Sequence, residues 1–224
     1  MESAKHSDGN QLVAFHKCMF EDLDLKESLL RGIYALGFAK PSPFQLEVML
    51  PILNGKNVIV QAQSGMRTLL AISALQILNI KLRLFHILMI VPTQERACGL
   101  LKVISELGDY MPISTCLCDK DLDFSLQQLK SGAQLVLATP DVITDLMEMK
   151  NLSLETLKFL LLDKTDQLLA SFSEQVNSIL KNIPNETQIG VFFNKPTKEF
   201  VESVEAFVKE PVKIFVEEEI EQDE

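Results

Sequence analysis

The chain has 224 residues, of which 47% are hydrophobic, so it can bury the core of one large α/β domain or two small ones. Its formal net charge is −10, and six acidic residues fall between positions 217 and 224. An acidic balance provides no general attraction to nucleic acid. Binding of RNA would therefore require a local basic groove, and the sequence contains no obvious one.

Cysteine spacing favours a reducing compartment, and the apolar runs give no sign of a membrane span or a signal peptide. Cys18, Cys98, Cys116 and Cys118 follow neither a zinc nor a disulfide spacing, and we expect Cys116 and Cys118 to be core thiols. No apolar run has the length of a membrane span, and residues 1–11 lack the apolar core of a signal peptide. We therefore expect a cytoplasmic or nuclear protein without membrane contact.

The N-terminal third is predicted to hold a flexible lead, two helices and a strand. Residues 1–19 form the lead, and apolar residues at helical spacing predict a helix from Phe20 to Leu36. Gly37 ends this helix, and a second helix follows over residues 44–53. The β-branched run at residues 58–61 predicts a buried strand, and an apolar helix then extends to about Leu78.

Strands and helices alternate in the rest of the chain. The predicted strands are 85–91, 114–118, 134–138, 158–162, 188–193 and 212–216, and the predicted helices are 93–107, 124–129, 140–149, 173–183 and 197–208. This alternation predicts an α/β fold with a mostly parallel sheet and helices on both faces. We expect one domain over residues 20–216, followed by an acidic tail at 217–224 that is typical of a solvated segment.

Ligands of such sheets bind at the carboxyl ends of the strands, and one loop there is close to a phosphate-binding pattern. A phosphate loop joins a strand to a helix with the pattern G-x-x-x-x-G-K-[ST], and its backbone N–H groups point at the anion. Residues 62–68 read AQSGMRT. Gly65 is present, but no second glycine follows, and Arg67-Thr68 takes the place of Lys-Thr.

The order of segments resembles the first RecA-like domain of DEAD-box RNA helicases, especially the translation initiation factor 4A branch. The resemblance covers about residues 20–216. Its most specific stretch is LLRGIYALGFAKPSPFQ at 29–45, which is similar to the Q motif, and two local matches are ELGDYM at 106–111 and EPVKIFV at 210–216.

The resemblance implies an adenine-binding role for two residues. In this family the Q-motif glutamine reads the adenine edge and an upstream aromatic residue stacks on the ring, and the matching positions are Gln45 and Phe20. The alternative is that Phe20 and Phe38 are core aromatics and that Gln45 is an ordinary solvated helix residue.

The phosphate and metal positions depart from the family pattern. The family sequence AQSGTGKT is one residue longer, so Gly65 lacks the second glycine of the motif. Arg67 places a planar guanidinium at the position where the family has the compact ammonium group of a lysine. Thr68 retains a hydroxyl for magnesium or is simply a helix-start residue. Asp163 matches the acid that orients magnesium in the family, or it is an ordinary residue at the end of a strand. The general-base glutamate of the family is replaced by Lys164.

The positions that meet RNA in the family are also different. Gln94 stands where the family has arginine, and Asp141-Val142 replaces a glycine-arginine pair. The family's GG pair has no counterpart between Cys118 and Phe124, a segment rich in aspartate. Acids that face phosphates repel them. Thr93 and Thr139 are retained, but each is also explained as a helix N-cap.

These residues predict a catalytically inactive helicase-like protein with no catalytic residue of its own. It would act through contacts with a scaffold or regulator of the helicase or translation machinery, with RNA binding weak or absent and no DNA partner. ATP and magnesium are its possible cofactors through Phe20, Gln45, Gly65, Arg67, Thr68 and Asp163. Three alternatives stay open: an ATP-dependent RNA helicase or ATPase that works with a second subunit, an adenine-nucleotide sensor without hydrolysis, and a functionless relic.

Overall fold

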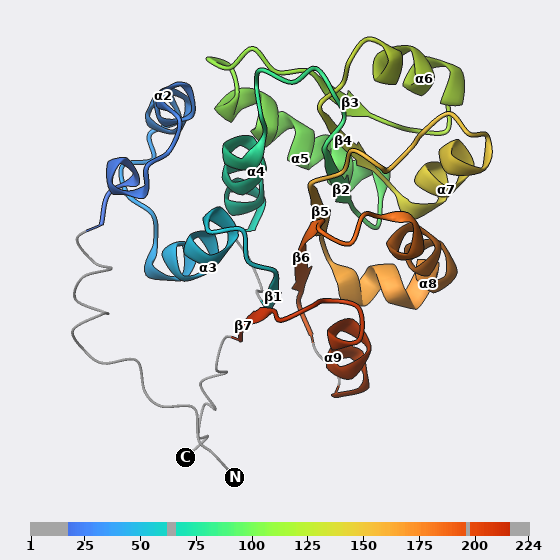
Figure 1. Ribbon diagram of the computed structural model, residues 1–224. Helices are drawn as coiled ribbons and strands as arrows, with labels where there is room; N and C mark the ends of the chain where they lie inside the picture. The colour runs from blue at the N-terminus through green and yellow to red at the C-terminus, as the bar shows by residue number, and fades with distance from the viewer. Residues whose placement is uncertain (1–17, 62–65, 196–197, 216–224) are drawn as a thin grey trace.

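The seven apolar runs form the strands of one sheet, and every pairing among the described residues is parallel (Figure 1). The computed structural model describes residues 18–61, 66–195 and 198–215. The strand order is β3-β4-β2-β5-β6-β1-β7. The strands are β1 Val58–Gln61, β2 Ile87–Ile90, β3 Thr115–Leu117, β4 Leu135–Ala138, β5 Phe159–Leu162, β6 Gln188–Phe193 and β7 Val212–Ile214.

Helices cover both faces of this sheet, as the alternation of strand and helix predicts (Figure 1). The helices α2 to α5 and the short 3-10 helix η1 pack on one side, and α6 to α9 pack on the other. The helices are η1 Phe20–Leu23, α2 Glu27–Ala35, α3 Pro43–Leu53, α4 Met66–Ile77, α5 Gln94–Leu107, α6 Leu122–Lys130, α7 Pro140–Glu148, α8 Thr165–Asn182 and α9 Lys198–Glu205.

Successive residues of the central strands enter two separate cores. In β1, Val58 and Val60 belong to the core shared with α3 and α4, whereas Ile59 belongs to the core shared with α7 and α8. All three are fully buried. A parallel sheet that is covered on both faces requires such continuously apolar strands. Each buried aliphatic side chain contributes about 1.5–3 kcal/mol to the free energy of folding.

The predicted helix from Phe20 to Leu36 is in fact two elements. Asp24 separates η1 from α2 and has a left-handed backbone with φ 51°. A left-handed residue cannot continue a right-handed helix, and aspartate tolerates this conformation better than most residues. Leu25 is buried beside the break, so the apolar spacing continues across it and conceals it.

The predicted helix at 173–183 was also placed wrongly at its start. Helix α8 begins eight residues earlier, at Thr165, and Phe172 interrupts it with φ −138° and ψ 33°. The buried residues before the interruption, Thr165 and Leu168, keep helical spacing with Val176 and Ile179 after it. The prediction covered only the half that follows the kink.

The other strands and helices lie within a few residues of their predicted bounds, and the predicted α/β fold is confirmed. The predicted acidic tail at 217–224 lies outside the described residues, as does most of the predicted lead at 1–19. Those two predictions and the domain bounds of 20–216 remain predictions.

Candidate functional site

The carboxyl ends of β2, β4 and β5 lie side by side, which brings together loops that are far apart in sequence. The backbone N–H of Asp163 donates to the carbonyl of Ile90 over 3.0 Å, and that of Val91 donates to the carbonyl of Ala138 over 3.1 Å. The segments that follow these strands begin at Val91, Thr139 and Asp163. The sequence placed the candidate pocket at this edge of the sheet.

Asp163 is bound by an arginine at this edge. The Arg96 Nε donates to Asp163 Oδ2 over 2.5 Å, and Arg96 Nη2 donates to Asp163 Oδ1 over 3.2 Å. The Asp163 side chain is only 2% exposed and the Arg96 side chain 23%. A guanidinium that meets both oxygens of a carboxylate forms one of the strongest side-chain pairs in proteins.

The start of α5 positions Arg96 for this contact. Thr93 is the N-cap of the helix, and its side chain accepts a hydrogen bond from the backbone N–H of Arg96 over 3.2 Å. Ala97 and Leu100 of the same helix are fully buried against the sheet. Arg96 therefore lies at the end of an apolar face, next to the edge of the sheet where β5 ends. The predicted N-cap role of Thr93 is confirmed.

The turn after Asp163 holds the residue that stands at the general-base position. Lys164 has a left-handed backbone with φ 56° and ψ 48° and is the N-cap of α8 without a side-chain cap. Its carbonyl accepts hydrogen bonds from Gln167 and Leu168. Thr165 is fully buried and donates its hydroxyl to the carbonyl of Leu162 over 3.1 Å. Among the described residues, Asp166 Oδ1 is buried without a hydrogen-bond partner.

The candidate phosphate loop is described only in part. Gly65 lies outside the described residues, while Arg67 and Thr68 are in the first turn of α4. Arg67 is exposed, and its Nη1 lies 3.3 Å from the position that a Cβ on Gly99 would take. The guanidinium of Arg67 therefore lies against α5 at Gly99. Thr68 is half-buried.

The two predicted adenine-binding residues have different environments. Phe20 is 1% exposed and belongs to the core, as the structural alternative predicts. Gln45 is half-buried in the first turn of α3 and forms a capping box with Ser42. Gln45 Oε1 accepts from the Ser42 N–H over 2.8 Å, and Ser42 Oγ accepts from the Gln45 N–H over 3.1 Å. Phe38, in contrast, is 38% exposed and is not a core residue.

A cavity of about 430 Å³ lies beside the ends of β2, β3 and β4. It is the place where the resemblance puts the RNA-facing positions. Asp141 Oδ1 is buried there and has no hydrogen-bond partner among the described residues. Thr139 is the N-cap residue of α7, as predicted, although its side chain makes no cap hydrogen bond. The polar side chains that line the cavity are Thr93, Gln94, Asp119, Lys120, Asp121, Thr139 and Asp141.

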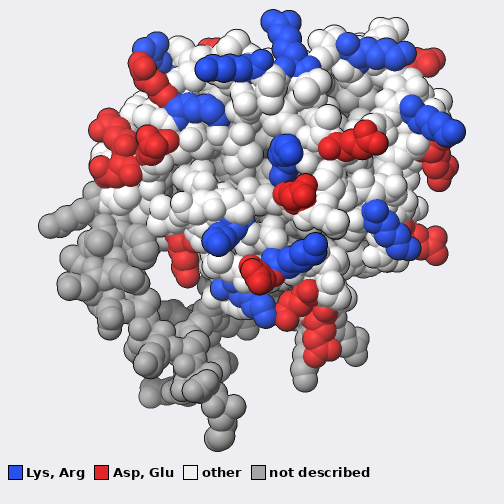
Figure 2. Space-filling view, viewed as in Figure 1, with Lys and Arg blue, Asp and Glu red and all other residues white. Residues whose placement is uncertain are grey.

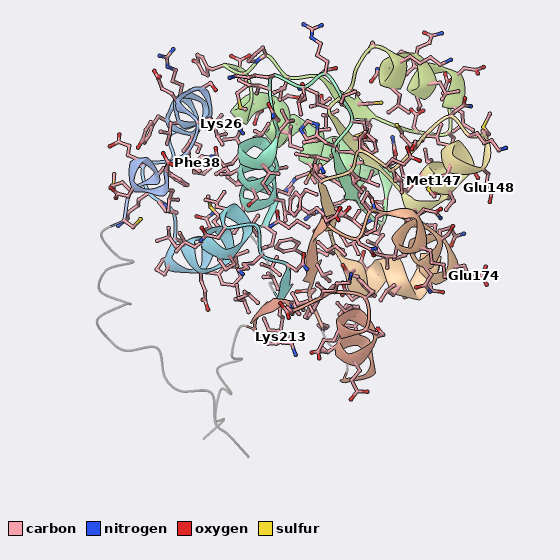
Figure 3. The ribbon with its side chains drawn as sticks, in the orientation of Figure 1. Lys26, Phe38, Met147, Glu148, Glu174 and Lys213 are labelled. Carbon is pink, nitrogen blue, oxygen red and sulfur yellow. The ribbon has the colours of Figure 1, made fainter. Side chains whose placement is uncertain are left out.

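Sequence reasoning missed a second half-buried cation, Lys26, at the start of α2 (Figure 3). Its ammonium donates to the carbonyls of Leu75 over 2.9 Å, Leu78 over 2.8 Å and Gln76, all at the end of α4. Burial lowers the pKa of Lys26 to about 8. Lys26 also lines a cavity of about 710 Å³ between α2 and the segment after α4. A cation at the end of a helix complements its dipole, so this contact fixes α2 on α4.

The predicted core environment of two cysteines is confirmed. Cys116 and Cys118 are free, fully buried thiols. His86 is 5% exposed, and its Nε2 accepts a hydrogen bond from the backbone N–H of Asn79 over 2.9 Å. Within the described ranges no cluster of three or more histidine, cysteine, aspartate or glutamate side chains is arranged to hold a metal ion. No helix of the described residues is long and apolar enough to span a membrane.

Comparison with known proteins identifies the family from which these elements derive. The DEAD/DEAH box helicase family matches residues 42–203, which is more than half of the chain. The chain belongs to the DEAD/DEAH box helicase family. The resemblance to the first RecA-like domain of these helicases is therefore confirmed.

Curated relatives agree with the initiation factor 4A branch. The ATP-dependent RNA helicase FAL1 of Lodderomyces elongisporus is 38% identical over 202 residues, which are 88% of this chain and 51% of the relative. Eukaryotic initiation factor 4A of Dictyostelium discoideum is 35% identical over 205 residues, or 89% of this chain and 51% of the relative. The chain spans about half the length of the curated relatives it matches.

Solved structures of helicases share the fold. A DEAD box protein from Methanococcus jannaschii matches with a TM-score of 0.83 and 25% identity, over 88% of this chain and 56% of that one. S. cerevisiae Dbp5 bound to Gle1 and IP6 matches with a TM-score of 0.81 and 25% identity, over 89% of this chain and 52% of that one. The seven-stranded sheet of this DEAD-box domain is thus the RecA-like fold.

Proposed function

We propose that this DEAD-box domain is catalytically inactive and acts through protein–protein contacts in RNA metabolism or translation regulation. The observation that carries the proposal is the residue after Asp163, where Lys164 occupies the position of the family's general-base glutamate. A cation cannot accept the proton of an attacking water. Loss of a general base typically slows a reaction about 10²–10⁴-fold, which corresponds to roughly 3–5 kcal/mol of activation free energy.

Weak or absent RNA binding is the second part of the proposal. The polar lining of the cavity beside β2, β3 and β4 includes three aspartates and one lysine. Basic and acidic side chains are interspersed over the described residues of the face in Figure 2, without a basic stripe across it. Affinity for an RNA backbone depends on clustered cations that release its counterions, and this arrangement provides few.

The protein-contact role is supported by what is seen in neighbours of the same fold. S. cerevisiae Dbp5 is bound to Gle1 in one such structure and to Nup159 and Gle1 in another. We propose that this chain likewise contacts a scaffold or regulator of helicases or of translation, in the cytoplasm or the nucleus. Recovery of such proteins with the tagged full chain is the expected result, and recovery of none contradicts this part of the proposal.

The rival function is an ATP-dependent RNA helicase, which the curated relatives favour by their identity of 35–38%. Hydrolysis of ATP by the purified full chain, with and without RNA, decides between the two. We expect no turnover above that of the Asp163→Asn variant, which controls for a contaminating ATPase. RNA-stimulated turnover that disappears in Asp163→Asn would overturn the inactive reading.

An adenine-nucleotide sensor without hydrolysis is the remaining candidate, and Gln45 favours it because it keeps the Q-motif position on α3. Calorimetry with AMP, ADP and ATP tests this candidate. A sensor that recognises adenine alone binds the three nucleotides with similar affinity. Gln45→Ala is the variant that should lose this binding, and Gln63→Ala is a matched amide control in the candidate phosphate loop.

A further inference from the structure

The residues around Asp163 do not fit the magnesium ion that the family resemblance assigns to it. Magnesium takes oxygen ligands in a near-octahedral shell and usually keeps several waters. Both carboxylate oxygens of Asp163 already accept hydrogen bonds from Arg96, and the side chain is 2% exposed.

We propose that Arg96 is the resident cation of this site and takes the place of the divalent metal. The proposal deepens the proposed function and rests on it, because a site whose carboxylate is permanently neutralised has no position for a catalytic metal. The guanidinium matches the carboxylate with two donors, Nε and Nη2. It also stays charged at every pH at which the protein is folded, unlike a lysine or a histidine.

The surrounding structure fixes both partners, so the pair is part of the fold. Asp163 is held at the end of β5 by its backbone hydrogen bond to Ile90. Arg96 is held by the Thr93 cap of α5 and by the buried Ala97 beside it. A metal ion at Asp163 would have to displace the guanidinium from a buried carboxylate or lie against a like charge.

Electron paramagnetic resonance with Mn²⁺ tests this proposal, because it counts free and bound ions without any need for enzymatic activity. The full chain is titrated with Mn²⁺ alone in four forms: wild type, Asp163→Asn, Arg96→Lys and Arg96→Met. The wild type and Asp163→Asn should give the same curve, which reports only the surface carboxylates. Arg96→Lys keeps a cation beside Asp163 and should also give this curve.

Arg96→Met should create a new site. Its Mn²⁺ affinity is expected to exceed the wild-type background by at least about tenfold, the size of effect that neighbours of a metal ligand commonly have. The gain should disappear in the double variant Arg96→Met/Asp163→Asn. A folded Arg96→Met chain without such a gain would overturn the proposal.

The wild-type comparison remains decisive if Arg96→Met does not fold. A Mn²⁺ site in the wild type that is lost in Asp163→Asn would overturn the proposal by itself. That result together with an absence of ATP turnover would leave the proposed function intact. Turnover of ATP by a chain with no Asp163-dependent Mn²⁺ site would instead overturn the proposed function and leave the Arg96 inference standing.

Discussion

The predicted nucleotide site has two ends that are held together in different ways. At the adenine end, Ser42 and Gln45 are three residues apart and bind each other through a capping box at the start of α3. At the metal end, Arg96 and Asp163 are 67 residues apart, and the carboxylate of Asp163 is buried. The first is a local pair at a helix end, and the second joins two distant segments of the fold.

This difference separates what a ligand could displace from what it could not. A side chain in a capping box contributes about 1 kcal/mol to stability, so a bound base can compete for Gln45 at little cost. A buried charge pair that loses one partner leaves the other charge without compensation. We therefore expect the adenine end to remain adaptable and the metal end to be closed. The predictions below test this contrast.

The largest effect is expected from Arg96→Ala, because this change leaves the Asp163 carboxylate buried and unpaired. We predict a loss of about 3–5 kcal/mol in the free energy of unfolding. Urea denaturation followed by circular dichroism measures it. The double variant Arg96→Ala/Asp163→Leu removes both charges and should recover most of the loss. A loss below about 1 kcal/mol for the single variant would show that the pair is not a buried constraint.

A smaller effect is expected from Gly32→Ala, which tests the packing of α2 against α5, the helix that carries Arg96. Gly32 lies on α2, and a Cβ there would be 1.9 Å from the carbonyl oxygen of Leu107 at the end of α5. The clash must push α2 away from the helix that carries Arg96. We predict a loss of about 1–3 kcal/mol. Ser28→Ala on the same helix is a control that should change stability by less than about 0.5 kcal/mol.

The capping pair of Ser42 and Gln45 at the adenine end should contribute less to the free energy of unfolding than Arg96→Ala or Gly32→Ala removes. Ser42→Ala removes the oxygen that accepts the Gln45 N–H, and we predict a loss of about 1 kcal/mol. Ser42→Asp retains an acceptor at the N-cap and should stay close to the wild type. The same urea titration measures both. Equal losses in the two variants would mean that the cap contributes nothing.

The smallest effect is expected for the coupling free energy between the adenine end and the metal end. If they are independent, the losses of Ser42→Ala and Arg96→Ala add to within about 0.3–0.5 kcal/mol in the double variant. A larger coupling energy would show that the adenine and metal ends form one cooperative unit. Melting of the four chains of this cycle under one buffer condition supplies the values. A coupling energy above about 0.5 kcal/mol would contradict the contrast between the two ends from which these predictions start.

Much of the fold could be predicted because apolar patterning determines it. A run such as Val58-Ile59-Val60 is typical of a strand covered on both faces, and all three residues are buried there. The errors occurred where the backbone departs from helical dihedral angles inside an apolar pattern, at Asp24 and at Phe172. Spacing reports which residues are buried, but it does not report a local break between them.

The candidate site was predictable in position but not in its main contact. Asp163 was placed at the end of a strand, yet Arg96 was not identified as its partner. A signal was present in the sequence. Arg96 begins the apolar face that continues through Leu100 and Ile104, and a charge at the end of a buried face needs a partner. Spacing alone does not say which acid that partner is.

If the domain is inactive as proposed, the Arg96–Asp163 pair also determines how ATP hydrolysis could be introduced into it. Restoring glutamate at position 164 would supply a proton acceptor beside an aspartate that is still bound by Arg96. Replacing Arg96 first would free the aspartate only in a chain that has lost part of its stability. Under the proposed function, neither substitution alone would give a chain with a free aspartate, a proton acceptor and full stability.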